Sequence, residues 1–197
     1  MRIEEEIKLD YSDVLFRPKR STLKSRKDVD LNRKYTFKHS RLSWKGIPII
    51  ASNMDGVGEI DVAKKLSSHK LMTALTKQHD INQIGTIYKK NIFFDSIALS
   101  CGTSKDSYNR LNSILKKYPK FKFICIDVAN GYSENFSNFV SEVRKKYPKK
   151  TIIAGNVVTA DMTQELVLSG ADIVKVGIGP GSVCTTRIQT GVGYPQL

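Results

Sequence analysis

Six short and almost continuously apolar runs follow one another through residues 47–178. They are IPIIAS (47–52), LMTALT (71–76), SIALSC (96–101), FICIDVA (123–129), TIIAG (151–155) and DIVKVGI (172–178). Apolar runs of this length, without polar alternation, are typical of parallel strands that are covered on both faces. The pattern therefore predicts six strands of one parallel sheet.

Amphipathic helical patterns separate several of these runs. Apolar residues at helical spacing form three stripes, which are Ile81, Ile84, Ile87 and Tyr88; Tyr108, Leu111, Ile114 and Leu115; and Phe136, Phe139, Val140 and Val143. Each stripe follows an Asp or Ser, and a further segment runs from an N-cap candidate at Thr159 to a C′ candidate at Gly170. Repeated strand and helix patterns predict an α/β protein.

Polar residues follow the ends of successive predicted strands, and they favour one α/β architecture. These residues are Asn53, Asp55, Lys77, Thr103, Asp127 and Asn156. In a (β/α)8 TIM barrel the carboxyl ends of all strands converge on one active-site face, whereas a doubly wound open sheet gathers ligands at one switch point. We predict an incomplete TIM barrel in which about six of the eight βα units are present.

The first 45 residues differ from the rest of the chain in their sequence pattern. They are mixed and basic, and YTFKHSRLSW (35–44) is a candidate hairpin. No linker or low-complexity segment divides the chain. We expect a single domain, 1–197, in which an N-terminal arm (1–45) lies over one end of a partial catalytic barrel (46–197) that ends after the Cys184 loop.

The formal net charge of +13 raises the possibility of nucleic-acid binding. Much of the basic excess, however, lies in two copies of KKYPK, at 116–120 and 145–149, where lysines close a helical pattern and proline stops it. No basic stripe interleaved with aromatic residues occurs, so we expect no nucleic-acid partner.

The start of the chain lacks an apolar segment, and no apolar run approaches the ~20 residues that span a bilayer. We expect a cytoplasmic protein with no membrane contact.

The three cysteines, Cys101, Cys125 and Cys184, are scattered and odd in number. This argues against a disulfide framework, and the absence of C-x-x-C argues against zinc. Cys101 and Cys125 lie in predicted strands and are expected to be structural. Cys184 lies instead in the glycine-rich stretch KVGIGPGSVCTTR (175–187).

Glycines in that stretch allow main-chain groups to approach a ligand or a monovalent cation closely. The stretch is neither a complete dinucleotide fingerprint nor a P-loop, and CTTR does not open an obvious helix. A thiol in such a loop is exposed on the predicted catalytic face, where Arg187 and loop amides could lower its pKa. Because the thiolate is the attacking species, Cys184 is a candidate nucleophile.

Here the sequence resembles a known family. GIGPGSVCTTR, followed by TGVGYPQL (190–197), is similar to the catalytic loop shared by IMP dehydrogenases and GMP reductases. DVANGYSENF (127–136) and KLDYSDVLFRPKRSTLKSR (8–26) resemble the reductase version of the family. Only one short helical pattern, between Asp80 and Asn91, separates the second predicted strand from the third, where dehydrogenases usually carry a regulatory domain pair.

The resemblance implies an NADPH-dependent oxidoreductase of purine metabolism that converts GMP to IMP and ammonia. Cys184 would attack purine C2 to give a thioimidate, and Thr186 would assist the ammonia step. Lys77 is the third implied catalytic residue and also contacts the cofactor. The resemblance also implies a homotetramer.

Further site residues come from the same resemblance. The implied NADPH contacts are Asp127, Val128, Ala129, Lys77, Ser25, Arg26 and Ile178. Ser182 would touch the nucleotide substrate, and Gly179 and Gly181 would offer carbonyls to a potassium ion.

The sequence departs from the family at the catalytic face. The family places histidines on both sides of the lysine, where this chain has Thr76 and Gln78, and a threonine where this chain has Gly56. The family's phosphate-binding glycine segments are also missing from these residues, so we expect this chain alone to turn over little GMP. Two alternatives stay open, namely an IMP dehydrogenase without its regulatory insert and a non-catalytic nucleotide-binding remnant.

Overall fold

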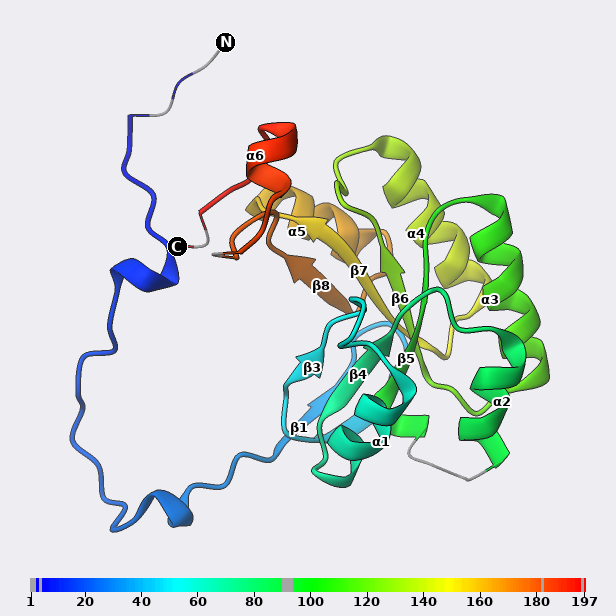
Figure 1. The fold of residues 1–197 in the computed structure, drawn as a ribbon, viewed down its shortest axis with the longest axis horizontal. Coiled ribbons are helices and arrows are strands. Elements are labelled where there is room, and N and C mark those ends of the chain that lie inside the picture. The colour runs from blue at the N-terminus through cyan, green and yellow to red at the C-terminus, as the bar shows by residue number, and fades with distance from the viewer. Residues whose placement is uncertain (1–2, 4, 90–93, 182, 196) are drawn as a thin grey trace.

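The computed structural model describes residues 3, 5–89, 94–181, 183–195 and 197. The six apolar runs form one parallel sheet in the order β3-β4-β5-β6-β7-β8. The strands are β3 (Ile50–Ala51), β4 (Met72–Leu75), β5 (Ile97–Cys101), β6 (Phe123–Asp127), β7 (Thr151–Val157) and β8 (Ile173–Val176). The sheet curls into part of a barrel (Figure 1), which confirms the predicted incomplete TIM barrel.

Five helices follow the first five strands of this sheet in turn and cover its outer face (Figure 1). They are α1 (Ile60–Ser68), α2 (Ile81–Lys89), α3 (Lys105–Lys117), α4 (Glu134–Lys146) and α5 (Ala160–Leu168). In α3 the Ser104 side chain caps the first turn by accepting from the Ser107 amide, and two lysines close the last turn before Tyr118. The helical stripes were thus predicted correctly, whereas α1 was not assigned from the sequence.

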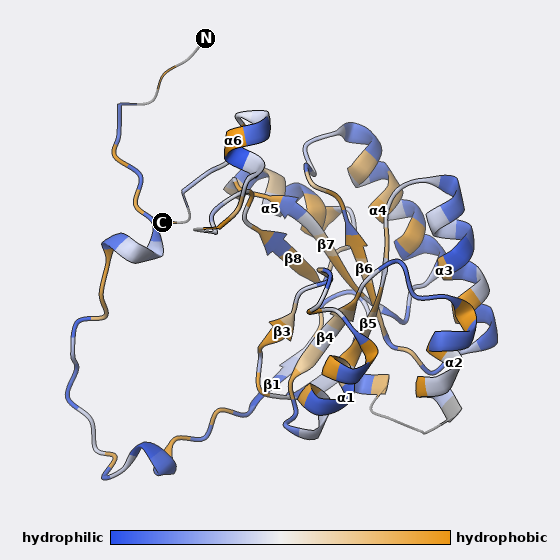
Figure 2. Ribbon diagram, viewed as in Figure 1, coloured by the Kyte–Doolittle hydropathy of each residue, from blue (hydrophilic) through white to orange (hydrophobic). Residues whose placement is uncertain are grey.

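The two faces of the sheet have separate cores, because successive strand residues point to opposite sides. In β6, Ile124 and Ile126 pack outward against the helices, and Phe123 and Cys125 pack inward. The outer core is the larger of the two. Hydropathy follows the same division, with apolar strands beneath helices that have a polar outer side (Figure 2).

A two-stranded antiparallel hairpin closes the amino end of the sheet. It consists of β1 (Arg33–Thr36) and β2 (Ser43–Gly46), where the hairpin was expected. Trp44 is buried in the inner core, and the Phe37 ring meets the Phe123 ring edge-on at 5.8 Å. This end of the partial barrel is therefore sealed by the last residues of the predicted arm.

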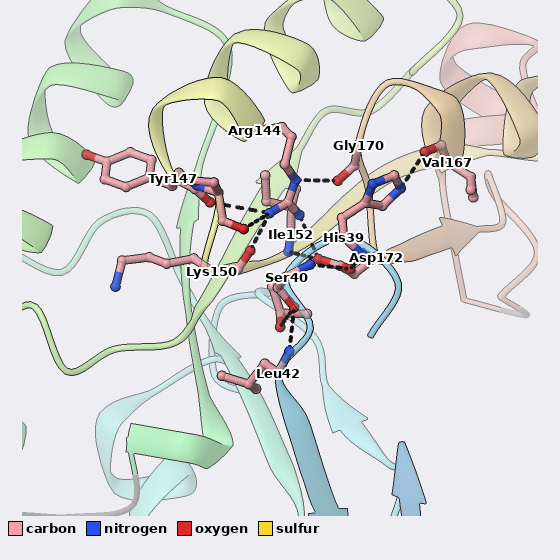
Figure 3. A network of polar contacts seen from close by, with 12 residues as sticks. His39, Ser40, Leu42, Arg144, Tyr147, Lys150, Ile152, Val167, Gly170 and Asp172 are labelled. Atoms are coloured by element: carbon pink, nitrogen blue, oxygen red, sulfur yellow. Dashed lines mark hydrogen bonds and ion pairs between the residues drawn. The ribbon is translucent and has the colours of Figure 1, made fainter. Parts of the chain in front are cut away.

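A polar network fastens this hairpin to the starts of β7 and β8 (Figure 3). The Asp172 carboxylate accepts from the amides of His39 at 2.8 Å, Ser40 at 3.2 Å and Ile152 at 3.2 Å. Arg144 from α4 pairs with the same carboxylate at 2.6 Å. Burial lowers the pKa of the Arg144 guanidinium, and the nearby Asp172 charge opposes that effect.

The rest of the arm takes a different course. Residues 5–32 run in a wide loop beside the barrel and do not cover its end (Figure 1). They hold two short 3-10 turns, η1 (Tyr11–Asp13) and η2 (Arg26–Asp28). The arm meets the barrel's last segment where the Leu197 amide donates to the Leu9 carbonyl at 2.9 Å. Within the described part of the chain, no helix is long and apolar enough to cross a membrane.

Candidate active site

A pocket of about 360 Å³ lies at the carboxyl ends of the strands. It is lined by Ser52, Asn53, Met54, Lys77, Asp127, Val128, Ala129, Asn156 and Lys175. Four of these, Lys77 and the run Asp127–Ala129, were expected from the sequence to contact a cofactor. The fold brings them together because Lys77 follows β4 and Asp127 ends β6, and parallel strands end on one face.

An ion pair joins Lys175 and Asp127, two of the residues that line this pocket. Lys175 Nζ also donates to Asn53 Oδ1 at 3.0 Å, so one amine joins the end of β6 to the loop after β3. In the sheet register Asp127 lies opposite Gly155, and Gly155 lies opposite Lys175. Because Gly155 has no side chain, Lys175 can reach across β7 to the carboxylate.

Sequence reasoning did not select Lys175 as a site residue. It occupies the same face of β8 as Ile173, two positions earlier, and that face points into the barrel. A lysine at an inward position of an apolar run was the signal that could have identified it.

The Cys184 loop follows β8 at the same end of the sheet (Figure 1). Asn156 Nδ2 donates to the Gly177 carbonyl at 2.9 Å, and the Gly177 amide donates to the Val157 carbonyl at 2.8 Å. These bonds fix the start of the loop against β7. A short helix, α6 (Thr186–Thr190), begins directly after Cys184 and Thr185, so the expectation that CTTR opens no helix was wrong.

The Cys184 thiol is partly exposed, and it is the most acidic of the three. Its pKa is lowered by the hydrogen bond with the Thr186 hydroxyl, then by the Thr186 amide and the Arg187 charge. Cys184 Sγ lies 3.3 Å from Thr186 Oγ1. Burial, by contrast, raises the pKa of Cys101 to about 12 and that of Cys125 to about 11, so these two thiols stay protonated.

The glycines of the loop allow its tight path. Gly179 adopts φ +66°, and a Cβ there would lie 2.9 Å from the Arg187 side chain. The Gly181 carbonyl accepts the Cys184 amide at 3.0 Å, which leaves one lone pair of that oxygen for another partner. Among the residues that the structure describes, no cluster of three or more His, Cys, Asp or Glu side chains could hold a metal.

Ser25, Arg26 and Ile178, like Cys184 and the other candidates of its loop, are not among the residues that line the pocket. Ser25 and Arg26 belong to the arm, where the Ser25 side chain caps the η2 turn by accepting from the Lys27 amide. Ile178 is buried, and its carbonyl accepts the Tyr194 amide at 3.0 Å. Ser182 lies outside the described residues. The roles assigned to these four residues stay predictions.

Two of the residues that depart from the family pattern, Thr76 and Gln78, flank Lys77 in the sequence. Thr76 is buried, and its hydroxyl has no hydrogen-bond partner within the described structure. Gln78 is exposed. His79 is buried with Nε2 3.3 Å from Glu59 Oε2. Gly56 has φ +75°, a conformation that glycine adopts more readily than the threonine of the family pattern.

Known proteins match this arrangement over nearly the whole chain. The chain is 56% identical to a GMP reductase of Yersinia enterocolitica over 199 residues and 56% identical to one of Klebsiella pneumoniae over 200 residues. Each match includes all of this chain, which spans 57% of the length of those relatives. The crystal structure of an inosine 5′-monophosphate dehydrogenase from Legionella pneumophila superposes with a TM-score of 0.77 at 29% identity, covering 96% of this chain and 56% of that one.

The family model that describes an IMP dehydrogenase / GMP reductase domain matches residues 8–197. That range holds the curled parallel sheet, the pocket at its carboxyl end and the loop with the acidic thiol. The chain belongs to the IMP dehydrogenase / GMP reductase family.

Proposed function

We propose that this chain supplies the nucleophile and part of the cofactor site of a GMP reductase, which converts GMP to IMP and ammonia with NADPH. The observation that carries the proposal is the contrast among the three thiols. Only Cys184 is accessible and has a lowered pKa, and it lies in a loop at the carboxyl end of the sheet. The 56% identity to curated GMP reductases supports the choice of reaction.

The residues suit a covalent mechanism in two stages. In the first stage Cys184 Sγ bonds to purine C2, and the bond from C2 to the exocyclic nitrogen breaks as that nitrogen leaves as ammonia with the protons it needs. In the second stage C2 gains a hydride and the bond from carbon to sulfur breaks, which releases IMP and returns the thiolate. A thiolate suits both stages, because it attacks well and also leaves well. The hydroxyl of Thr186, next to the sulfur, is placed to stabilise the thiolate before attack and after release.

NADPH, when bound, would supply the hydride. The pocket at Asp127–Ala129 suits one end of such a cofactor, because its volume of about 360 Å³ lies in the range of small-ligand sites. Lys77 would add positive charge at the rim, and the pair of Lys175 with Asp127 would hold the carboxylate in one orientation. A potassium ion at the carbonyls of Gly179 and Gly181, a tetrameric assembly and a cytoplasmic location belong to the same proposal.

A dehydrogenase is the second candidate, since the Legionella structure matches the fold. The connection between β4 and β5 argues against it. Residues 76–96 hold α2 and the short turn η3 (Phe94–Ser96), and this length leaves no room for an inserted domain pair. The remnant alternative is tested by the same experiment as the reductase.

The experiment joins residues 1–197 covalently to the remaining part of the Yersinia relative and supplies GMP with NADPH, or IMP with NAD. We expect IMP, ammonia and NADPH oxidation from the first pair only. Cys184→Ala should lower this rate by at least about 10³-fold, the scale seen for removal of a nucleophile, and Cys125→Ala is the matched control. A folded chimera that acts on neither pair, or whose activity survives Cys184→Ala, would refute the proposal.

A further inference from the structure

A groove of about 640 Å³ lies at the amino ends of β6 and β7, at the opposite end of the barrel from the Cys184 loop. Five lysines line it, namely Lys120, Lys122, Lys146, Lys149 and Lys150. They come from the ends of the two KKYPK copies and from the residues that lead into the two strands. The two copies, which look like separate helix ends in the sequence, therefore meet on one surface. We call this hollow the lysine groove.

Hydrogen bonds hold the two loops of the lysine groove in place. Lys150 Nζ donates to the carbonyls of Pro119 at 3.0 Å and Phe121 at 2.5 Å, which joins the loop after α4 to the loop after α3. Arg144 Nη1 donates to the carbonyls of Tyr147 at 3.3 Å and Lys150 at 2.8 Å (Figure 3). The walls of the groove are therefore fixed by the protein itself, and a ligand would find them already formed.

Three of the five lysines have charges that no ion pair neutralises. Lys122 pairs with Asp95 at 2.6 Å. Among the described residues, no carboxylate lies within ion-pair distance of Lys120, Lys146 or Lys149, and all three lysines are exposed. The carboxyl ends of α3 and α4 oppose these charges with roughly half a negative charge each. Three ammonium groups exceed that amount, so the groove is positively charged.

The rest of the lining gives the groove a second property. Apart from Asp95, the other residues that line it are apolar or aromatic, namely Leu42, Phe94, Pro119, Tyr147 and Pro148. Lys120 Nζ lies 5.7 Å from the centre of the Phe94 ring. Lys146 Nζ lies 5.8 Å from the centre of the Tyr147 ring. Amines beside aromatic rings, in a hollow within the size range of small-molecule sites, suit a ligand that is anionic at one end and apolar at the other.

We propose that the lysine groove binds a nucleoside di- or triphosphate, with the phosphates on Lys120, Lys146 and Lys149 and the base against the apolar residues. Ammonium groups form strong charge-assisted hydrogen bonds with phosphate oxygens, and three of them can offset most of the charge of a triphosphate. A polynucleotide is a poorer occupant, because its binding sites extend along the strand, whereas these lysines gather in one hollow. The groove lies at the other end of the barrel from Cys184, so this site does not depend on the proposed reaction.

Isothermal titration calorimetry of ATP into the 197-residue chain, without magnesium, tests the proposal. We expect binding whose Kd rises about tenfold in each of Lys120→Gln, Lys146→Gln and Lys149→Gln, because each change removes one charge-assisted hydrogen bond. Lys65→Gln is the matched control, since Lys65 also lies in the last turn of a helix, α1, but does not line the groove. Inorganic tripolyphosphate should bind at least about tenfold more weakly than ATP, because it has no base to stack.

A further variant separates the groove from the pocket at the carboxyl ends of the strands. Lys77→Ala changes that pocket and should leave the Kd for ATP unchanged. Circular dichroism checks that every variant keeps its fold. Lys149 lies in the turn after α4, so Lys149→Gln leaves both helices intact and decides the matter if a helix-end variant fails to fold.

Four results would overturn the proposal. One is a folded chain that does not bind ATP, or that binds it equally well after all three glutamine substitutions. Another is a Kd for ATP that rises with Lys77→Ala, which would place the nucleotide in the other pocket. Equal binding of ATP and tripolyphosphate would exclude any role for the base. Tighter binding of an RNA of about 20 nucleotides through the same lysines would make a polynucleotide the ligand.

Discussion

Replacing Asp172 with alanine should lower the free energy of unfolding by about 3–5 kcal/mol, the range for breaking a buried ion pair. The Asp172 side chain is 0% exposed and its partner Arg144 is 14% exposed. The substitution leaves a buried guanidinium without its counter-charge. It also leaves three amides, those of His39, Ser40 and Ile152, without an acceptor (Figure 3).

Urea unfolding followed by far-UV circular dichroism measures this change. For a chain of this size each kcal/mol corresponds to roughly 2–4 °C in Tm, so the midpoint of thermal unfolding should fall by about 6–20 °C. The largest local effect should be at the hairpin β1–β2, because Asp172 joins the hairpin's turn to the sheet. Hydrogen exchange of the amides at 39–40 should therefore accelerate more than exchange in β5.

A matched control separates burial from the mere presence of a salt bridge. Lys122 and Asp95 are also 2.6 Å apart, but their side chains are 42% and 60% exposed. Asp95→Ala should cost less than about 1 kcal/mol, because water screens and replaces an exposed pair. Equal losses for Asp172→Ala and Asp95→Ala would refute the reasoning, since it rests on desolvation and not on distance.

Three further predictions address the site. Thr186→Val removes the hydroxyl that lowers the pKa of Cys184, so the pH midpoint for alkylation of Cys184 by iodoacetamide should rise. Thr185→Val removes no hydrogen bond to the thiol and should leave this midpoint unchanged. Equal midpoints for the two variants would contradict the assigned cause of the lowered pKa. Gly155→Ala places a Cβ 2.5 Å from the Lys175 carbonyl oxygen and should cost about 1–3 kcal/mol in urea unfolding, whereas Gly102→Ala, whose Cβ would meet nothing nearer than 3.9 Å, should be nearly neutral. In the chimera, the double substitution Thr76→His and Gln78→His restores the family's histidines on both sides of Lys77. It should raise kcat by about 10–100-fold if proton transfer near Lys77 limits the rate. An unchanged kcat would show that Thr76 and Gln78 do not slow the reaction.

The sequence alone predicted the strands, most of the helices and the incomplete barrel. Short apolar runs and helical stripes are local signals, and each reports the burial of its own segment. The GIGPGSVCTTR stretch singled out Cys184 as a candidate nucleophile, because a thiol among glycines differs from the strand thiols at Cys101 and Cys125; its catalytic role stays a prediction. Helix α1 was missed, although it packs Ile60 and Ala63 against the outer core.

Only the tertiary structure decided which residues meet. Lys175 pairs with Asp127 because β6 and β8 lie on either side of β7 and Gly155 leaves the space between them open. Asp172 looked like a strand-start residue in the sequence, yet it anchors a hairpin more than 130 residues earlier in the chain. Such pairs depend on the curvature and register of the whole sheet, and no local pattern contains that information. The lowered pKa of Cys184 depends on both the local sequence and the folded structure. Its main cause, Thr186, is two residues away in the sequence, but the orientation of Thr186 comes from the start of α6.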